Sequence, residues 1–395
     1  MIAPRAAQAM DPPIMAAQGW LEGVTFPPDR PLINVSQAAP VEPPPLPLRE
    51  EIARLARDEP EAHLYGPVLG LPALRAEVAA QWSDAYGGAI RPEQVAITSG
   101  CNQAYAAALM AVAGEGSEVI LPVPWYFNHA MWNQMIGVRT VPLPTGPGMV
   151  PRAEDAAPLI TSRTRAIALV SPNNPTGAEY PAETLAAFHD LARAHGLALI
   201  VDETYRDFDA RAGRPHELFA RPDWDETLIH LYSFSKAYRL TGHRVGAMIA
   251  SPARLATAEK FLDTVTICPN QLGQRAALWG MRNLGQWVAG ERNEILARRA
   301  AVTEYFTRLA EGGWALLGCG AYFAFLRHPF AIASDDLAPL LVREAGLLML
   351  PGSMFLPPGD PAGQTTFRLA FANVDRAGIA EVIGRLAKVD LPRRD

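Results

Sequence analysis

A lysine lies among hydroxyl groups in the segment Ser233-Phe-Ser-Lys-Ala-Tyr-Arg-Leu-Thr-Gly-His-Arg244. A lysine amine can form a Schiff base with an aldehyde. Around Lys236, the side chains of Ser233, Ser235 and Arg244 offer donors for the oxygens and the charge of a phosphate group. Lysines near serines are also common on solvated surfaces, so this segment alone leaves the role of Lys236 open.

Two upstream segments supply further groups of the same chemistry. Asp202 follows the apolar run Leu197–Val201, and a carboxylate at the end of a strand can reach a ligand crevice. Such a carboxylate would keep a pyridine nitrogen protonated, and the charged ring would accept electrons from a substrate carbon. A helix cap or a loop ion pair is the plainer role for Asp202. Tyr205 and Asn174 can each direct a polar group to a ring oxygen. Together with Lys236, these residues predict pyridoxal phosphate as the cofactor.

The junction Ser99-Gly100-Cys101-Asn102 follows the predicted strand Val95–Thr98 and opens a helix. Backbone N–H groups at a helix N-terminus bind anions, and Gly100 permits a close approach of the backbone. We therefore expect the phosphate at Gly100, Cys101 and Asn102. The segment Pro124–His129 offers an aromatic face for the ring, from either Trp125 or Tyr126.

Arg368 is a lone arginine in the apolar strand-like run Thr366–Phe371. A buried arginine needs a partner, and its planar fork matches a carboxylate. The partner is either the α-carboxylate of a substrate or an acidic side chain of this chain. Trp20, Phe26 and Trp132 either shape a pocket for a neutral or aromatic substrate side chain or, as the simpler view has it, belong to the core.

The bulk composition narrows the class of protein. The 395 residues carry a net charge of -6, which argues against a nucleic-acid surface, and no apolar run is long enough to span a bilayer. The N-terminal residues have no apolar stretch of signal-peptide length. Cys101, Cys268 and Cys319 are far apart and form no C-x-x-C pair, so we expect neither a zinc or other metal site nor a disulfide framework, and a cytoplasmic location.

The pattern of apolar runs predicts an α/β fold. Short strands with little alternation lie between helical patterns, as expected for a large domain with a mostly parallel sheet covered by helices. We expect residues 1–47 to form an N-terminal arm, 48–285 the large cofactor-binding domain and 286–395 a smaller α+β domain that the arm helps to build. The predicted strands are Val95–Thr98, Glu118–Leu121, Ala166–Val170, Leu197–Val201, Leu228–Tyr232, Val245–Ala250, Ala321–Leu326 and Thr366–Phe371.

From about Ile33 to Asn373 the chain resembles the fold-type I pyridoxal-phosphate-dependent aminotransferases of class I/II, the aspartate aminotransferase-like family. Its most specific motifs are Ser171–Gly177 and Ser233–Arg244. The resemblance implies transfer of an amino group between an L-α-amino acid and a 2-oxo acid, through an internal aldimine on Lys236. It also implies that Lys236 moves the proton from the substrate's Cα.

The resemblance implies a role for each site residue. Around the ring it implies Asp202 on the pyridine nitrogen with His129 behind it, Tyr205 and Asn174 on the ring oxygen, and Tyr126 as the stacking ring. For the phosphate it implies Arg244, Ser233 and the backbone of Gly100–Asn102, and for the substrate it implies Arg368, with Ala38 and Asn174 nearby. Tyr65 matches the tyrosine that reaches the phosphate in the partner subunit, which implies a homodimer with shared active sites.

The chain departs from the family pattern at two positions. Ala38 stands where a Gly-x-Pro motif usually begins, and His243 stands where a tryptophan often precedes the phosphate arginine. No second arginine is assigned to a side-chain carboxylate, so a preference for dicarboxylates is not supported. The alternatives are another reaction on the same fold, such as C–S β-lyase activity or oxidative deamination, and a cofactor-binding regulator without catalysis.

Overall fold

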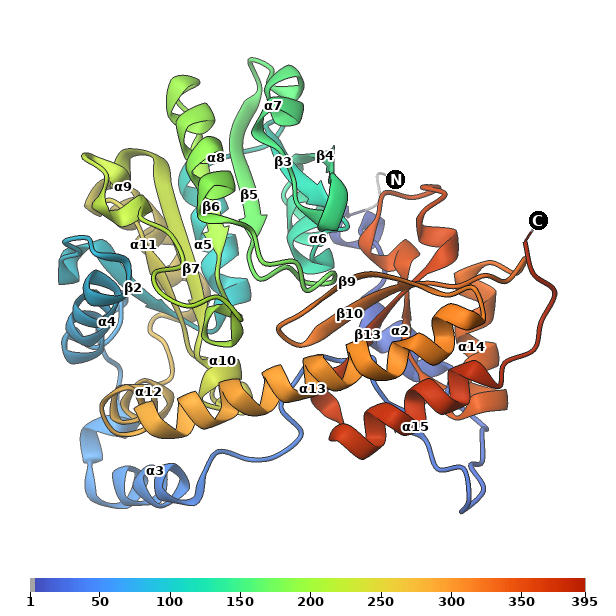
Figure 1. The fold of residues 1–395 in the computed structure, drawn as a ribbon. Coiled ribbons are helices and arrows are strands. Elements are labelled where there is room, and N and C mark those ends of the chain that lie inside the picture. The colour runs from blue at the N-terminus through green and yellow to red at the C-terminus, as the bar shows by residue number, and fades with distance from the viewer. Residues whose placement is uncertain (1–3, 395) are drawn as a thin grey trace.

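The largest sheet has seven strands, and helices cover both of its faces (Figure 1). The computed structural model describes residues 4–394 of the chain. The strand order is β2-β8-β7-β6-β5-β3-β4, and only the two pairs that include β8 are antiparallel. The predicted α/β class with a mostly parallel sheet is confirmed. The bounds are β2 Val95–Thr98, β3 Glu118–Val123, β4 Arg139–Pro144, β5 Thr164–Val170, β6 Ala198–Asp202, β7 Leu228–Ser233 and β8 Gly246–Ile249.

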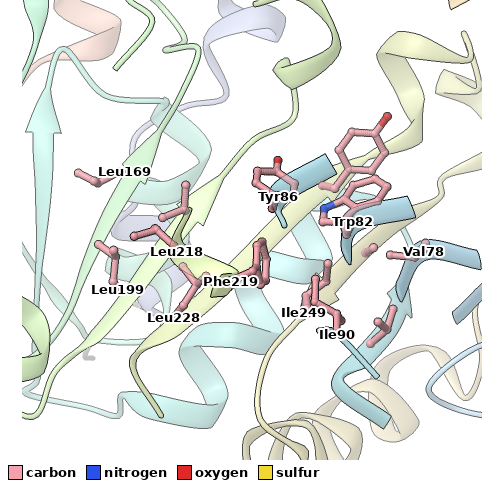
Figure 2. Packing of buried hydrophobic residues seen from close by; sticks show 14 of the residues in the cluster. Val78, Trp82, Tyr86, Ile90, Leu169, Leu199, Leu218, Phe219, Leu228 and Ile249 are labelled. Carbon is pink, nitrogen blue, oxygen red and sulfur yellow. The ribbon is translucent and has the colours of Figure 1, made fainter. Parts of the chain in front are cut away.

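Strand β6 shows why these strands read as continuous apolar runs. Leu199 and Val201 pack into the core on one face of the sheet, whereas Ala198 and Ile200 pack into the core on the other. Successive side chains of a strand point to opposite faces, so a strand covered on both faces needs apolar residues at every position. Figure 2 shows part of the core that contains Leu199, where α4 (Pro72–Tyr86) packs against the strands.

A hydrophobic core lies on each face of the large sheet, and different helices cover the two faces. On one face lie α4, α8 and α12, and on the other face lie α5 and α11. The helix α8 ends at Ala194, two residues before Gly196, whose φ of +63° suits a residue without a side chain. The bounds of the helices around the large sheet are α3 Leu46–Asp58, α5 Cys101–Val112, α6 Phe127–Met135, α7 Ala153–Ala156, α8 Ala182–Ala194, α9 Trp224–Thr227, α10 Phe234–Ala237, α11 Pro252–Thr266 and α12 Gln271–Asn283.

The C-terminal part forms a separate antiparallel sheet of four strands in the order β12-β13-β10-β9. Figure 1 shows the long helix α13 running beneath both sheets. The strands are β9 Ala315–Gly320, β10 Phe323–Arg327, β12 Leu350–Pro351 and β13 Thr366–Ala370, and the helices are α13 Gly285–Glu311, α14 Ser334–Ala345 and α15 Arg376–Ala387. The predicted strand Ala321–Leu326 corresponds to β10, but Ala321 has a φ of +43° and belongs to the turn before it, and β9 was not predicted.

The N-terminal segment packs against this second part. Strand β1 (Ile33–Asn34) pairs in parallel with β11 (Leu347–Leu348). Helix α1 spans Arg5–Gln8, and helix α2 spans Pro13–Gly19. Ala17 of α2 is fully buried in a core that includes Phe127 and Leu348. The arm therefore joins the large sheet's helix α6 to the smaller sheet. Within residues 4–394, no helix combines the length and the apolar character needed to cross a bilayer.

Candidate active site

A cavity of about 400 Å³ opens at the carboxyl ends of β5, β6 and β7. Ligands of parallel α/β sheets bind at this edge because the loops after the strands leave a crevice there. Most of the residues singled out from the sequence lie in its wall. They are Ala38, Cys101, Asn102, Tyr126, Asn174, Asp202, Tyr205, Ser233, Ser235, Lys236, Arg244 and Arg368.

Lys236 lies in the short helix α10, directly after β7. Its Nζ donates a hydrogen bond to the carbonyl oxygen of Ala38 at 2.6 Å. Burial, together with the nearby positive charges of Arg368 and Arg244, lowers the pKa of Lys236 to about 8. A substantial part of the amine is therefore neutral near pH 8, and only the neutral amine can act as a nucleophile or a base.

Asp202 is the last residue of β6, and it is buried. Its Oδ2 lies 3.3 Å from Nε2 of His129, and its Oδ1 accepts a hydrogen bond from the backbone N–H of Thr204 at 3.0 Å. Burial alone would raise the pKa of Asp202, but the contacts with His129 and Thr204 outweigh it and hold the pKa below its usual value. The ring of Tyr105 stacks on His129 at 3.7 Å. Asp202 is thus a fixed carboxylate that stays ionised.

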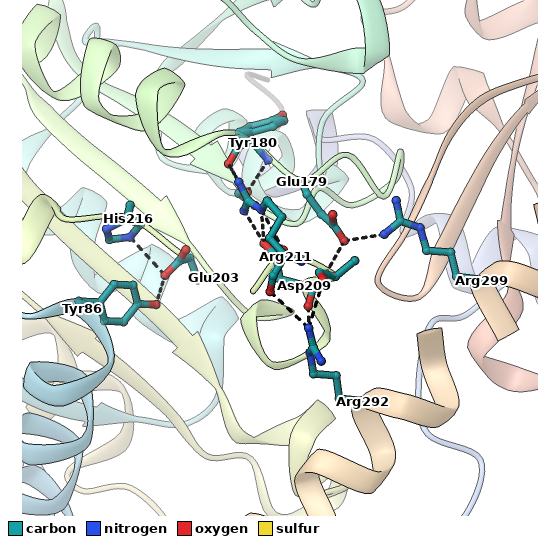
Figure 3. Close-up of polar contacts among 11 residues, drawn as sticks. Tyr86, Glu179, Tyr180, Glu203, Asp209, Arg211, His216, Arg292 and Arg299 are labelled. Atoms are coloured by element: carbon teal, nitrogen blue, oxygen red, sulfur yellow. Dashed lines mark hydrogen bonds and ion pairs between the residues drawn. The ribbon is translucent and has the colours of Figure 1, made fainter. Parts of the chain in front are cut away.

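The next residue, Glu203, is held by a buried cluster of its own, and Figure 3 shows its contacts with Tyr86 and His216. Its Oε2 accepts a hydrogen bond from the Tyr86 hydroxyl and lies 2.7 Å from His230 Nε2 and 3.4 Å from His216 Nε2. Although burial opposes ionisation, His216 and His230 hold the pKa of Glu203 well below its usual value. Sequence reasoning missed this cluster because its members come from positions 86, 203, 216 and 230, with no common motif.

The predicted phosphate site is a cradle of donors. Gly100 precedes α5, so the first backbone N–H groups of that helix have no partner within the helix. Arg244 Nη1 lies 3.4 Å from Ser235 Oγ, and Ser233 Oγ accepts a hydrogen bond from the backbone N–H of Ser235. A Cβ atom at Gly100 would overlap Arg244 Nη2, and Gly100 has a φ of +83°. Only glycine lets the guanidinium approach this helix end.

Arg368 is almost completely buried in β13. Its Nη1 donates to Asn174 Oδ1 at 2.9 Å, its Nη2 donates to the carbonyl oxygen of Ser36, and its Nε has no hydrogen-bond partner. Burial lowers the pKa of Arg368 to about 10. The ion pairs formed among residues 4–394 do not include it, so the proposed acidic partner from this chain is not found. A buried guanidinium without a counter-charge is a site for an anion.

Two tyrosines flank the space between these groups. Tyr126 donates a hydrogen bond to Asn102 Oδ1 at 3.2 Å, and burial raises its pKa to about 12. Burial likewise raises the pKa of Tyr205, whose ring centroid lies 5.8 Å from Lys236 Nζ. Trp125, the other aromatic candidate, is buried in the core of the large sheet and does not line the cavity. Tyr126 is therefore the available ring face.

The family model for aminotransferase class I and II matches residues 30–386. The chain belongs to this family. It is 29% identical over 347 residues to aromatic-amino-acid aminotransferase 2 of Thermococcus litoralis, covering 86% of this chain and 87% of that one. It is 32% identical over 313 residues to a probable N-succinyldiaminopimelate aminotransferase of Mycobacterium tuberculosis, covering 76% and 77%. A mutant of Thermus thermophilus aspartate aminotransferase superposes with a TM-score of 0.87 at 26% identity, covering 98% of this chain and 99% of that one.

Aminotransferases of this family depend on pyridoxal phosphate, and the residues present fit that cofactor. The cradle at Gly100 and Arg244 suits a phosphate, Asp202 suits a protonated ring nitrogen, and Lys236 suits an aldehyde. The unpaired Nε of Arg368 leaves a donor for a substrate carboxylate in the same cavity.

Three predicted residues lie outside the wall of this aminotransferase's cavity. Gly100 lies behind Arg244, and His129 lies behind Asp202. Tyr65 is 80% exposed and stays a prediction, since its expected partner is a second subunit. The sequence analysis missed several wall residues, namely Pro12, Pro13, Ile14, Gln37, Phe127, Asn128, Val170 and Thr204. The N-terminal residues among them carry no motif, and folding of the arm brings them here.

Proposed function

We propose that Lys236, Asp202 and Arg368 carry the transamination. The observation that carries the proposal is their arrangement around one cavity: a lysine whose pKa is lowered to about 8, a fixed carboxylate, and a buried guanidinium with an unpaired Nε. Bound pyridoxal phosphate supplies an electron sink for the negative charge that develops at the substrate's Cα.

Arg368 orients the amino acid by binding its α-carboxylate. A bidentate guanidinium–carboxylate pair fixes both position and direction, which brings the Cα–H bond toward the amine of Lys236. Asn174 and the Ser36 carbonyl hold the guanidinium in place. The neutral amine of Lys236 then takes the proton from Cα, a general-base role that suits a group whose pKa lies near the working pH.

Asp202 keeps a positive charge on the ring by remaining ionised opposite it. His129 and Thr204 support that ionised state. Tyr205 and Asn174 contact the ring oxygen of the cofactor, and Tyr126 stacks on the face of its ring. Gly100, Cys101, Asn102, Ser233, Ser235 and Arg244 serve the phosphate.

The proposal includes a homodimer with active sites shared between subunits. Leu64, Tyr65, Val265 and Ile267 are exposed apolar side chains, and the Gly66 N–H donates to Cys268 Sγ at 3.4 Å, which brings the two segments together. An exposed apolar patch of this kind is typical of an interface. Analytical ultracentrifugation tests it: Tyr65→Asp is expected to weaken the dimer, and a wild-type monomer at micromolar concentration would contradict it.

The proposal also divides the chain into an arm (1–47), a large domain (48–285) and a small domain (286–395). The separate sheets in the two larger parts support the division. A cytoplasmic location is proposed as well, in keeping with the free thiols of Cys101, Cys268 and Cys319.

The experiment for the proposed function follows the first half of the reaction. The purified protein with pyridoxal phosphate is mixed with single amino acids, and both the cofactor spectrum and the 2-oxo acid are measured. A stoichiometric oxo acid, with recovery of the starting spectrum on adding a second oxo acid, is expected. Continuous release of pyruvate and ammonia without an oxo acid would indicate the β-lyase instead.

A further inference from the structure

Glu179 lies two residues after the segment Ser171–Gly177, and its carboxylate joins three separate parts of the chain (Figure 3). Its Oε1 accepts a hydrogen bond from the backbone N–H of Ala210 at 2.9 Å and another from Arg299 Nη1 at 2.9 Å. Ala210 follows the turn that carries Tyr205, and Arg299 belongs to α13. The side chain of Glu179 is only 11% exposed. Burial raises its pKa, and the contacts with Ala210 and Arg299 oppose that rise.

The loop between Asn174 and Glu179 is held by hydrogen bonds of its own. The backbone N–H of Asn173 donates to the carbonyl oxygen of Ala178 at 2.8 Å. Asn173 Nδ2 donates to the hydroxyl of Tyr180, the residue directly after Glu179, at 3.1 Å. A displacement of Glu179 is therefore passed to Asn174 through a short, hydrogen-bonded loop.

The turn from Tyr205 to Ala210 is held in a similar way. The backbone N–H of Phe208 donates to the carbonyl oxygen of Tyr205 at 2.9 Å, and both rings are buried in the core of the smaller domain. Arg292 of α13 donates to the carbonyl oxygen of Ala210 at 3.2 Å. Glu179 thus binds the N–H of Ala210, while α13 binds its carbonyl oxygen.

The two loops have to keep a fixed spacing for the proposed function. Asn174 and Tyr205 come from the loops after β5 and β6, yet both contact the same ring oxygen of the cofactor in that proposal. Groups that share one target atom have to be held within about 0.5 Å by the contacts around them. Glu179 links these loops beyond the end of the sheet, as does Arg211, whose Nη1 donates to the carbonyl oxygen of Tyr180 at 2.6 Å.

We propose that Glu179 is a positioning residue, which fixes the turn of Tyr205 against the loop of Asn174. The inference rests on the proposed function, which places both of these side chains on the ring oxygen. A hydroxyl that donates to this oxygen stabilises its negative charge, so the bound cofactor loses its proton at a lower pH. The pKa of the bound cofactor therefore reports whether Tyr205 is correctly placed.

The test follows the visible absorption band of bound pyridoxal phosphate as the pH is varied. Glu179→Ala removes the acceptor for the Ala210 N–H and is expected to raise the pKa of the bound cofactor by about one pH unit, the scale of one hydrogen bond to a charged oxygen. Glu179→Gln keeps an acceptor oxygen and is expected to stay close to wild type. Glu294→Ala is the matched control, because it removes an ion pair with Arg298 of α13 at a side chain that is 51% exposed, and it is expected to leave the pKa unchanged.

Tyr205→Phe shows whether Glu179 acts through Tyr205. The single variant is expected to raise the pKa of the bound cofactor, and adding Glu179→Ala to it is expected to raise the pKa little further, since coupled residues are not additive. If Tyr205→Phe raises the pKa and folded Glu179→Ala does not, or if the two effects simply add, the positioning role alone is overturned. An unchanged pKa in Tyr205→Phe contradicts the proposed function at the ring oxygen, and the positioning role with it. Glu179→Met, which fills a similar space without an acceptor, replaces Glu179→Ala if that variant does not give a wild-type circular dichroism spectrum.

Discussion

Replacing Gly100 by alanine tests the predicted phosphate site, formed by Gly100 and Arg244, without changing the other residues of the active site. The residue has φ +83° and ψ 167°, a region that side chains rarely adopt, and a Cβ there would overlap Arg244 Nη2. Backbone strain of this kind costs about 1–3 kcal/mol. Displacing Arg244 also removes hydrogen bonds to a charged group, which contribute about 1.5–3 kcal/mol. We therefore expect the Kd for pyridoxal phosphate to rise about 10- to 150-fold.

The assay titrates the apoprotein with pyridoxal phosphate and follows protein fluorescence. Gly116→Ala is the matched control, since Gly116 has a φ of +79° but a Cβ there meets nothing within 4 Å. The control is expected to lose stability while keeping the wild-type Kd. A wild-type Kd for Gly100→Ala, or an equal loss of affinity in the control, would refute the cradle.

Three further predictions concern the lysine, the substrate arginine and the N-terminal arm. Lys236 has a pKa of about 8 when folded and 10.5 as its ordinary value, so the unfolded chain binds more protons between these pH values. The apoprotein should therefore gain stability relative to Lys236→Met as pH rises from about 8 to 10.5, measured by urea unfolding, and a flat difference would contradict the lowered pKa. Arg368→Lys loses the planar guanidinium that binds a carboxylate through two hydrogen bonds, so the KM for amino acids should rise about tenfold or more while the cofactor spectrum stays unchanged. An unchanged KM would show that Arg368 does not bind the substrate. Arg239→Gln removes the ion pairs of Arg239 with Glu42 in the arm and with Glu291 in α13, and it should lower kcat/KM a few-fold. Arg57→Gln, at an exposed ion pair, should leave kcat/KM unchanged, and steady-state kinetics of both variants decide the point.

Some of the site follows from local features of the sequence. Asp202 comes at the end of an apolar strand, and Lys236 lies just after another, so the rule that strand ends meet at one edge brings them together. Arg368 stood out because a charge in an apolar strand needs a partner. Each of these inferences needs only a segment of about ten residues and its place in a sheet.

Other parts depend on contacts between distant segments. Pro12, Pro13 and Ile14 reach the cavity only because the arm packs between α6 and the small sheet. Strand β4 was missed because it contains Pro142 and Pro144, which are tolerated there since β4 is an edge strand with one side exposed. Neither the position of the arm nor strand β4 produces a regular spacing of apolar residues that could be recognised in the sequence.

The most direct test of the central role of Lys236 uses Lys236→Ala protein and wild type side by side. Each is loaded with pyridoxal phosphate, mixed with one amino acid, and sampled for the 2-oxo acid over time. The account predicts that the variant still binds the cofactor, through the cradle around Gly100 and Arg244, but forms the oxo acid at least a thousandfold more slowly, the scale of losing a positioned base. Oxo acid formation at the wild-type rate would contradict the account.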